Sequence, residues 1–257
     1  MLLAINANNT NIKFALYDGD KLLGDWRIKT EPARTADEYI VWLAQLLSMA
    51  GHRLDGIKGA IIASVVPQAV FNLEQLCVKH LRTKPLILGQ GKLDYGIKIL
   101  IDQPDEVGAD RIANAVGARL LYAKPVIVVD FGTATTFDVI DGEGNYCGGI
   151  IAPGINLSLQ ALHEATAKLP RIVVERPSQV IGRDTLSAMQ SGIYWGYISL
   201  MEGLIARIQK EFPQIEKVIA TGGLAPLFFG ATKVLDHIEP EITMLGLREI
   251  YRRNVNI

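Results

Sequence analysis

The sequence predicts an α/β protein in which one structural unit occurs twice, and three observations support this. Residues 2–19 and 126–142 follow one pattern: an apolar strand, a short polar turn, a second strand and then Asp-Gly. Asn6 aligns with Asp130 at an offset of 124, whereas the second strands align at 123, so one residue has slipped. Residues 60–66 form a continuous apolar run, which is typical of a buried parallel strand.

In the first copy, the sequence pattern predicts strands over residues 1–29, with a hairpin turn at 17–20. Thr35 and Glu38 form a capping box that starts the next helix, and Gly51 supplies its C-terminal stop. The remaining elements are a strand at 60–66, a helix to about residue 80, a strand at 85–88 and a helix at 109–122.

The second copy begins at Pro125 and predicts strands to about residue 151. Asp184 caps a long helix to about residue 212, whose apolar residues cover more than one face. Such a helix is buried within the monomer or at a subunit interface. The other elements are a helix at 158–165, a strand at 217–220 and a helix at 246–253. The repeat predicts two domains, residues 1–122 and 123–257.

Composition excludes several classes of function. Among 257 residues, 26 are basic and 27 acidic, so the net charge of −1 gives no footprint for nucleic acid or an anionic membrane. No apolar run reaches the roughly 20 residues of a membrane span, and no signal peptide is expected. Cys77 and Cys147 lie far apart, which argues against a disulfide scaffold or a zinc site and favours the cytoplasm.

The first polar turn, residues 6–13, has the composition of a phosphate-binding turn. A strand that runs into a tight turn exposes successive backbone N–H groups, which form a concave anion site. Thr10 and the side-chain amides of Asn9 and Asn11 add further donors. A plain β-hairpin that uses asparagine for its turn explains the same residues, so this segment alone leaves both interpretations open.

The second polar turn carries a stronger signal, because an acidic residue ends its apolar strand. Asp130 lies where ligands of open α/β sheets gather, at the carboxyl end of a strand. Gly132 lets the backbone approach a ligand, and Thr133, Thr135 and Thr136 supply hydroxyls. We expect Asp130 to face a cation; the alternative is that its carboxylate caps a turn.

A third segment, residues 104–111, places a carboxylate and a guanidinium in the first turn of a helix. Asp110 is suited to general-base catalysis, and Arg111 to holding a carboxylate or phosphate. Stabilisation of the helix N-terminus by Asp110 explains the pattern equally well. Residues 221–223, Thr-Gly-Gly after a predicted strand, suit a place where a planar ring rests on backbone, although such turns are common.

Together these segments resemble the type III pantothenate kinases, members of the acetate and sugar kinase/Hsc70/actin superfamily. The resemblance covers essentially the whole chain. It rests on Asn9-Thr10-Asn11, Ser64-Val65-Val66-Pro67, Val107-Gly108-Ala109-Asp110-Arg111, Asp130-Phe131-Gly132-Thr133-Ala134-Thr135-Thr136, Pro153-Gly154, Ile181-Gly182 with Thr185, and Thr221-Gly222-Gly223.

The resemblance implies a duplicated ribonuclease H-like fold, as in actin-like ATPases, and a cytoplasmic homodimer with its active site near the subunit interface. It also implies ATP-dependent phosphorylation of pantothenate to 4′-phosphopantothenate, the first step of coenzyme A biosynthesis.

The resemblance further implies roles for individual residues. Asp110 is the catalytic base that takes the proton from the substrate's primary hydroxyl. Asp130 binds a monovalent cation, potassium or ammonium, and a divalent ion, magnesium, accompanies ATP. The residues assigned to pantothenate are Gly108, Ala109, Asp110, Arg111 and Thr185, with Thr185 contributed by the partner subunit. The residues assigned to ATP are Asn6, Asn8, Asn9, Thr10, Asn11, Lys13 and Thr133.

Three positions depart from the family pattern. The family has Asp-x-Gly-Asn-Thr in the first turn, but here Asn6 and Asn8 replace the aspartate and the glycine. An amide keeps an oxygen ligand for the divalent ion but loses the charge. Ile101 stands where many members carry a tyrosine that contacts substrate. Two alternatives therefore stand beside an active pantothenate kinase: a weak or inactive member that acts as a regulatory or binding protein, and a kinase for another small alcohol.

Overall fold

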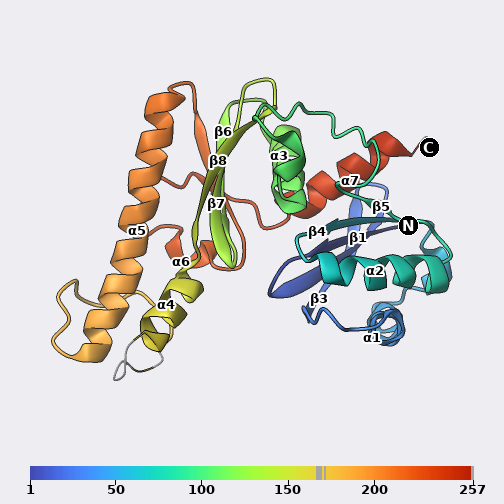
Figure 1. The fold of residues 1–257 in the computed structure, drawn as a ribbon, viewed down its shortest axis with the longest axis horizontal. Coiled ribbons are helices and arrows are strands. Elements are labelled where there is room, and N and C mark those ends of the chain that lie inside the picture. The colour runs from blue at the N-terminus through green and yellow to red at the C-terminus, as the bar shows by residue number, and fades with distance from the viewer. Residues whose placement is uncertain (166–169, 171, 256–257) are drawn as a thin grey trace. The chain divides into compact units, whose positions relative to one another are not determined.

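A computed structural model describes residues 1–165, 170 and 172–255 of the chain (Figure 1). The chain divides into two compact units, which are described separately. Unit 1 comprises Met1–Leu121 and the chain from Glu241 onward, and unit 2 comprises Tyr122–Pro240.

Unit 1 is built on a five-stranded sheet with the strand order β3-β2-β1-β4-β5. The first three strands are antiparallel neighbours, whereas β4 runs parallel to β1 and β5 parallel to β4. The strands are β1 (Leu2–Ala7), β2 (Asn11–Asp18), β3 (Lys21–Lys29), β4 (Gly59–Ser64) and β5 (Leu86–Ile87). The helices are α1 (Ala36–Met49), α2 (Pro67–Gln75, continued by a π-helical turn over Leu76–His80), α3 (Ala109–Leu121) and α7 (Ile242–Asn254), with 3₁₀ turns at Leu54–Gly56 and Pro104–Glu106.

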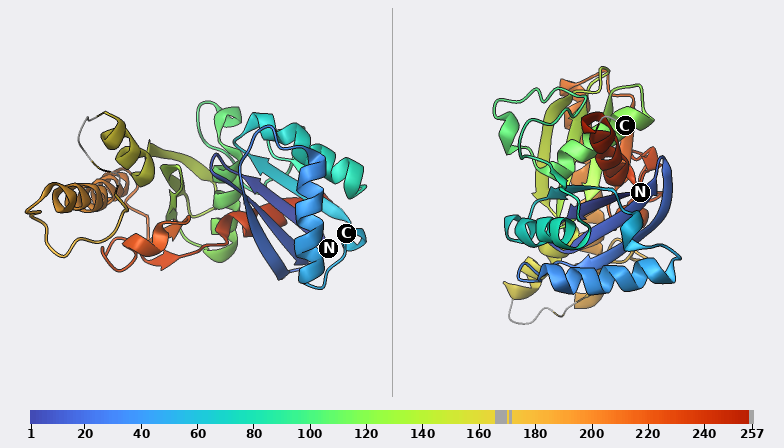
Figure 2. Two further views of the ribbon diagram at one scale, coloured as in Figure 1. Left: turned by 90° about the horizontal axis from the view of Figure 1, so that it is seen from below. Right: turned by 90° about the vertical axis from the view of Figure 1, so that its right-hand side faces the viewer.

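Alternation along β1 sends side chains into two hydrophobic cores, one on each face of the sheet of unit 1. Leu3 and Ile5 pack with residues of α1 and α2, whereas Ala4, between them, packs with residues of α3 and α7. The left view of Figure 2 shows the blue strands of this sheet with the blue helix α1 alongside. Because β1 is central and buried on both faces, the turn at its carboxyl end starts from a rigid base.

α3 and α7 cross at close range within unit 1, although some 120 residues separate them in sequence (Figure 1). A methyl group added at Gly246 would collide with the carbonyl oxygen of Ala113, and one at Gly117 with the carbonyl oxygen of Ile242. The Thr243 hydroxyl also donates to Asn114 Oδ1 at 2.6 Å. Glycine on both helices is therefore what lets the two backbones touch.

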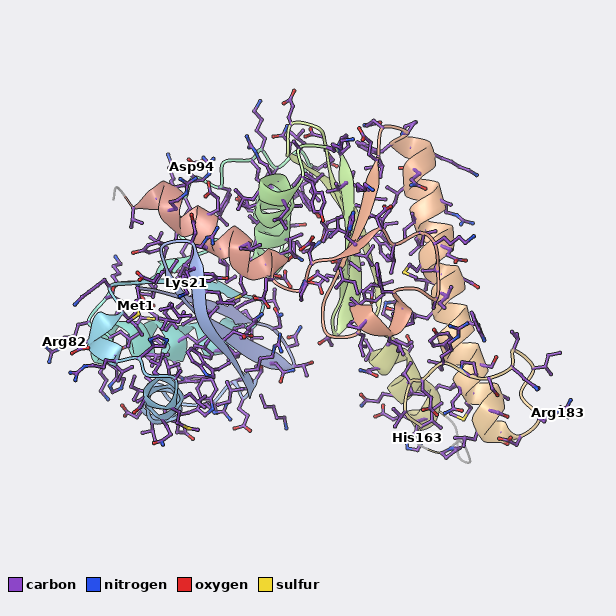
Figure 3. The ribbon with its side chains drawn as sticks, turned by 180° about the vertical axis from the view of Figure 1, so that it is seen from behind. Met1, Lys21, Arg82, Asp94, His163 and Arg183 are labelled. Carbon is purple, nitrogen blue, oxygen red and sulfur yellow. The ribbon has the colours of Figure 1, made fainter. Side chains whose placement is uncertain are left out.

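The C-terminal end of α7 is hydrogen-bonded to the segment around Asp94, which precedes α3 in the chain. The backbone N–H of Asp94 donates to Asn254 Oδ1 at 2.8 Å, and Asn254 Nδ2 donates to the carbonyl oxygen of Asp94 at 2.9 Å. Figure 3 labels Asp94 beside the C-terminal end of α7. α7 thus fixes both α3 and the segment that leads into it.

Unit 2 repeats the architecture of unit 1. Its sheet has the order β10-β9-β6-β7-β8, with β6, β7 and β8 antiparallel, β9 parallel to β6 and β10 parallel to β9. Read from the other edge, this is the strand order and direction pattern of unit 1. The strands are β6 (Val126–Phe131), β7 (Ala134–Ile140), β8 (Tyr146–Pro153), β9 (Lys217–Thr221) and β10 (His237–Ile238), and the helices are α4 (Ile155–Glu164), α5 (Thr185–Glu211) and α6 (Ala225–Phe228).

The predicted duplication is confirmed down to the slipped residue. In the first hairpin Asn6 pairs with Lys13, and in the second Asp130 pairs with Thr136. The first turn is therefore one residue longer than the second. Both predicted helix starts are confirmed as well, because the Thr35 and Asp184 side chains each accept a hydrogen bond from the backbone N–H three residues on.

Three features differ from expectation in the last third of the chain. The expected second domain ran from residue 123 to 257, whereas the chain re-enters unit 1 at Glu241, because α7 packs on α3. α7 also begins at Ile242 rather than at residue 246, and the short strand β10 had no sequence signal. Every helix of the described residues is too short or too polar to cross a membrane.

Candidate active site

The first polar turn joins β1 to β2 and is closed by its own backbone. The N–H of Asn8 donates to the carbonyl oxygen of Asn11 at 3.0 Å. Thr30, which follows β3, holds the turn from the side, because its N–H donates to Thr10 O at 3.0 Å and its hydroxyl to Asn8 O at 2.6 Å. Asn9, Thr10 and Asn11 are exposed. The donors predicted to meet phosphate therefore lie at the surface of a fixed turn.

The end of β4 lies next to this turn and explains one of the sequence motifs. The N–H of Val65 donates to the carbonyl oxygen of Ala7 at 3.1 Å, so the motif of residues 64–67 begins beside the last residue of β1. Ser64 Oγ accepts from the N–H of Val66 at 3.0 Å, and Pro67 opens α2. The parallel pairing of β1 and β4 brings the two segments together, as expected for strand ends at one edge of a sheet.

The second polar turn joins β6 to β7 and is closed in the same way. The N–H of Gly132 donates to Ala134 O at 3.1 Å, and the N–H of Gly154, after β8, donates to Thr133 O at 3.1 Å. Gly154 thus occupies the place that Thr30 has in unit 1, and Thr133 the place of Thr10. Thr133 is exposed, as its predicted role in binding ATP requires.

Asp130 is half-buried at the end of β6, opposite Thr221 of β9. Gly222 follows Thr221 with φ of +89°, and a methyl group there would lie 2.7 Å from Asp130 Oδ1. The bare glycine therefore leaves room for the carboxylate. The structure brings together two segments that the sequence singled out separately, the acidic strand end and the Thr-Gly-Gly turn.

The two hairpins carry opposite charges at equivalent cross-strand pairs. Asn6, neutral, faces Lys13 in unit 1, whereas Asp130, acidic, faces the neutral Thr136 in unit 2. Asn6 is only 6% exposed, and its Oδ1 has no hydrogen-bond partner among the residues that the structure describes. The same holds for Asn8 Oδ1. An unpartnered buried oxygen is costly, so these amides are poised to accept from a ligand.

Lys13, predicted to bind ATP, is paired with two carboxylates in the structure. Its Nζ lies 2.5 and 2.6 Å from the two Glu241 oxygens and 3.3 Å from Asp25 Oδ2. Sequence reasoning missed both acids, because Glu241 is 228 residues away and Asp25 lies on the neighbouring strand.

Asp110 is the second residue of α3 and is half-buried. Its Oδ1 accepts the backbone N–H of Arg111 at 2.8 Å. Burial raises the pKa of the Asp110 carboxyl above its ordinary value, and the Arg111 N–H and guanidinium oppose that rise. A carboxylate with a raised pKa is a stronger proton acceptor, which suits a general base. Gly108, Ala109 and Arg111 lie beside it at the start of the helix.

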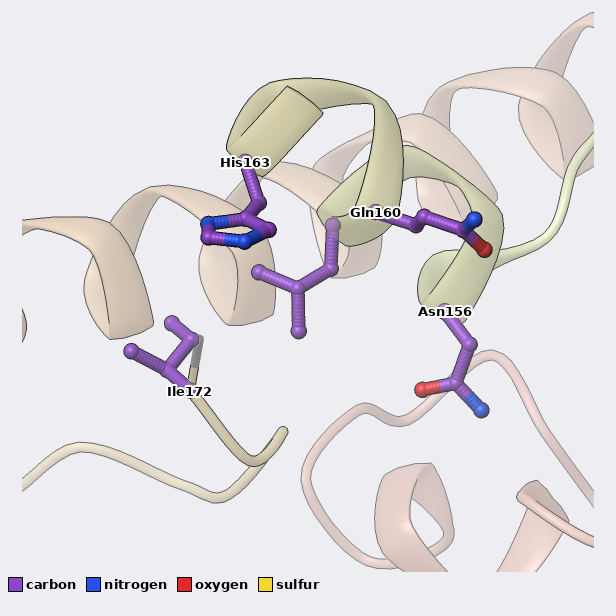
Figure 4. Close-up of a pocket in the computed structure, with 5 residues that line it drawn as sticks. Asn156, Gln160, His163 and Ile172 are labelled. Carbon is purple, nitrogen blue, oxygen red and sulfur yellow. The ribbon is translucent and has the colours of Figure 1, made fainter. Parts of the chain in front are cut away.

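Thr185 is the exposed first residue of α5 and lines a pocket in unit 2. The pocket lies between α4 and the first turns of α5, and its lining residues are Leu162, Thr185, Ala188, Met189, Gly192 and Ile193. A second pocket, on α4 and Ile172, is shown in Figure 4. Its described lining, Asn156, Leu159, Gln160, His163 and Ile172, includes no residue that the sequence predicted for a site.

Comparisons with known proteins identify the family of this chain. The sequence model of a family described as type III pantothenate kinase matches residues 2–207. A type III pantothenate kinase from Paramagnetospirillum magneticum is 60% identical over 99% of this chain and 98% of its own length. One from Rhodospirillum rubrum is 56% identical over 99% of both chains.

Solved structures share the fold at low sequence identity. A 2-dehydro-3-deoxygalactonokinase-like protein from Sinorhizobium meliloti superposes with a TM-score of 0.63 at 12% identity, covering 98% of this chain and 96% of its own. A protein from Campylobacter jejuni described as a Baf family transcriptional activator gives 0.62 at 18% identity, covering 99% and 100%.

The fold is thus that of the actin-like ATPase and sugar kinase class, with two ribonuclease H-like units. Within that class, this chain belongs to the type III pantothenate kinase family.

Proposed function

We propose that this chain transfers the γ-phosphoryl group of ATP to the primary hydroxyl of pantothenate, giving 4′-phosphopantothenate in the first step of coenzyme A biosynthesis. Membership of the family over almost the full chain supports this reaction. The observation that carries it is the half-buried Asp110 with a raised pKa, next to Arg111 at the start of α3.

Asp110 acts as the catalytic base. As the hydroxyl oxygen of pantothenate bonds to the γ-phosphorus, its proton passes to the Asp110 carboxylate. The bond from the γ-phosphorus to the bridging oxygen breaks, and ADP leaves with the electron pair. Gly108, Ala109 and Arg111 hold the substrate beside the base, and the planar guanidinium of Arg111 is suited to an anionic group of pantothenate. Most of the rate acceleration then comes from positioning.

The polar turns hold the nucleotide. In unit 1, the exposed Asn9, Thr10 and Asn11 offer side-chain donors to phosphate oxygens, with Asn6, Asn8 and Lys13 behind them. In unit 2, Thr133 occupies the position equivalent to Thr10 and takes the equivalent role.

The donor groups fit the expected cations differently. Asp130, a half-buried carboxylate at a strand end, suits potassium or ammonium. A magnesium ion would arrive with the ATP phosphates. The buried Asn6 Oδ1 suits that ion or a water bound to it. Once bound, these cations neutralise phosphate charge.

The proposal is tested by incubating purified protein with ATP, magnesium, potassium and pantothenate and detecting phosphopantothenate by mass spectrometry. We expect turnover that depends on both substrates. No product from correctly folded protein, or faster turnover of another small alcohol, would overturn the assignment.

Both cysteines are unpaired, which supports placing the reaction in the reducing cytoplasm.

Restoring the family's acidic residue in the first turn is expected to strengthen magnesium binding, so that less magnesium is needed. Asn6→Asp, combined with Asn8→Gly, adds a carboxylate where a neutral amide oxygen now lies. We expect the magnesium concentration that gives half-maximal ATP binding to fall about tenfold, because a charged oxygen is a stronger ligand for a hard cation. Titration of magnesium at fixed ATP measures this.

A control is Gln45→Glu, which adds one negative charge at an exposed position of α1, outside the residues assigned to ATP. It is not expected to strengthen magnesium binding. If the Asn6→Asp, Asn8→Gly variant and the wild type require equal magnesium, Asn6 does not face the divalent ion.

The protein is also proposed to form a homodimer, and exposed apolar residues in unit 2 support this. We define the apolar patch as Leu157, Leu162, Val180, Ile181 and Leu186, which are between 36% and 81% exposed. Leu157 and Leu162 belong to α4, whereas Val180, Ile181 and Leu186 lie within five residues of Thr185, at the start of α5 and in the segment before it. Apolar surface of this kind is typical of subunit interfaces, and a second copy covering it brings the partner's surface to the Thr185 pocket.

Leu186→Glu is expected to convert the dimer to a monomer, because it would bury a charge in the interface. Light scattering after size-exclusion chromatography gives the mass. The control is Phe71→Glu on α2, which changes a more exposed apolar residue of unit 1, 66% against 47% for Leu186, and should leave the dimer intact. A wild-type monomer, or a Leu186→Glu dimer, would refute the assignment of this patch.

A further inference from the structure

Lys13 is the one charged residue of the first polar turn, residues 6–13, and the structure neutralises it. Its side chain is 11% exposed and contacts both oxygens of Glu241, at 2.5 and 2.6 Å, and Asp25 Oδ2, at 3.3 Å. One ammonium between two carboxylates leaves a net formal charge of −1. A polyphosphate that approaches this turn therefore meets a cation already occupied by acids.

The counter-ions come from outside the hairpin because the facing residue within it is neutral. Asn6 is directly opposite Lys13 in the β1–β2 register and carries no charge. Glu241, the residue that precedes α7, supplies the bidentate partner instead. The state of Lys13 is thus set by a residue at the point where the chain re-enters unit 1.

Breaking the ion pair between Lys13 and Glu241 would affect the two side chains differently, because they differ in exposure to water. The Glu241 side chain is 33% exposed, so water can solvate its carboxylate if Lys13 turns away. The Lys13 side chain is nearly buried, so its ammonium needs another anion in place of Glu241. Exchange of Glu241 for a phosphate oxygen meets both requirements, whereas simple rupture of the pair does not.

We propose that Glu241 competes with the nucleotide's phosphates for the Lys13 ammonium, and that this competition sets the affinity of the first polar turn for ATP. The inference rests on the proposed ATP-binding role of that turn. Glu241 is a positioning residue here: it acts on the nucleotide only through Lys13.

The test is calorimetric titration of Glu241→Gln with ATP, ADP and adenosine at low and moderate salt. The amide removes the competing charge but keeps the size of the side chain. We expect the Kd for ATP to fall about fivefold, the scale of a modest ion pair. The gain should shrink at higher salt, and the Kd for adenosine, which has no phosphate, should not change.

Two controls separate this effect from general changes. Asp20→Asn removes the same charge from an 89% exposed side chain that pairs with Arg248 of α7 at 3.3 Å, and it should leave the Kd for ATP unchanged. Lys13→Met combined with Glu241→Gln should bind ATP no more tightly than Lys13→Met alone, because the competition requires the ammonium. If the two substitutions act additively, Glu241 does not work through Lys13 and the inference is wrong.

The possible failures are distinguishable. Wild-type protein that binds no ATP overturns the proposed function itself. ATP binding by the wild type, with Glu241→Gln no tighter, overturns only the inference. If thermal unfolding shows that Glu241→Gln is not folded, Asp25→Asn takes its place. Asp25→Asn should tighten ATP binding by a smaller factor, because Asp25 lies farther from Lys13; no tightening there overturns the inference.

Discussion

Asp110→Asn is expected to lower kcat for pantothenate phosphorylation by about 10²- to 10⁴-fold, the usual contribution of a general base. The amide has nearly the same shape as the carboxylate and can still accept the N–H of Arg111, which lies 2.8 Å from Asp110 Oδ1. It cannot accept the proton of the substrate hydroxyl. KM should change little, so the loss should be confined to the chemical step. Steady-state kinetics with varied pantothenate measure both constants.

The pH dependence of the wild type should report the same group. Activity requires the deprotonated carboxylate, and burial raises the pKa of Asp110 above its ordinary value. The acidic limb of the kcat profile should therefore begin at a higher pH than for an ordinary exposed aspartate. The matched control is Asp105→Asn, an exposed acid in the 3₁₀ turn before α3, which should keep normal kcat and the same acidic limb.

The Asp110→Asn substitution should lower activity without lowering the stability of the fold. A carboxyl whose pKa is raised in the folded state binds its proton more tightly there, so its contribution to stability falls as pH rises through the pKa. At neutral pH the charged form opposes folding, and Asp110→Asn should unfold at the same or a higher temperature. A variant with full activity would show that Asp110 is not the base. A variant that is inactive and strongly destabilised would assign it a structural role.

Gly246→Ala is expected to destabilise unit 1 by about 1–3 kcal/mol, the usual cost of overpacking. The added methyl would collide with the Ala113 carbonyl oxygen, a backbone atom that cannot rotate away. Alanine is otherwise the better helix former by about 1 kcal/mol, so a net loss of stability measures the contact between α3 and α7. Gly117→Ala should behave alike, through the carbonyl oxygen of Ile242.

Denaturant unfolding followed by tryptophan fluorescence can follow unit 1 by itself. Trp26 and Trp42 lie in unit 1 and Trp195 in unit 2, so a Trp195→Phe background leaves only the reporters of unit 1. The matched control is Gly196→Ala on α5, where an added methyl meets open space. The control should be neutral or slightly stabilising when followed in the Trp195-containing protein. If Gly246→Ala is also neutral, α7 is not packed against α3 as described.

Local signals in the sequence were enough to predict most of the fold. The offset between Asn6 and Asp130 identified both hairpins, and the capping residues Thr35 and Asp184 located two helix starts. These features depend on a few neighbouring residues, so a linear reading finds them. The first turn of α7 was missed because its packing partner, α3, lies more than 100 residues earlier.

The residues of the candidate site likewise fall into those that local sequence predicts and those that only tertiary packing brings together. The catalytic and phosphate-binding candidates form contiguous motifs, and the sequence therefore points to Asp110, Asp130 and the two turns. The counter-ions of Lys13 belong to no motif, because Glu241 and Asp25 meet it only through the packing of α7 and β3. Electrostatic partners of this kind require the tertiary structure.

The return of the chain to unit 1 has a consequence for how the protein is made. Synthesis proceeds from the N-terminus, and domains generally fold as units as they emerge. Unit 2 is continuous and is complete once Pro240 has been added, whereas the sheet of unit 1 still lacks α7 on one face. The core of unit 1 is therefore completed after that of unit 2, because α3 and the apolar residues beneath it stay uncovered until α7 has been added.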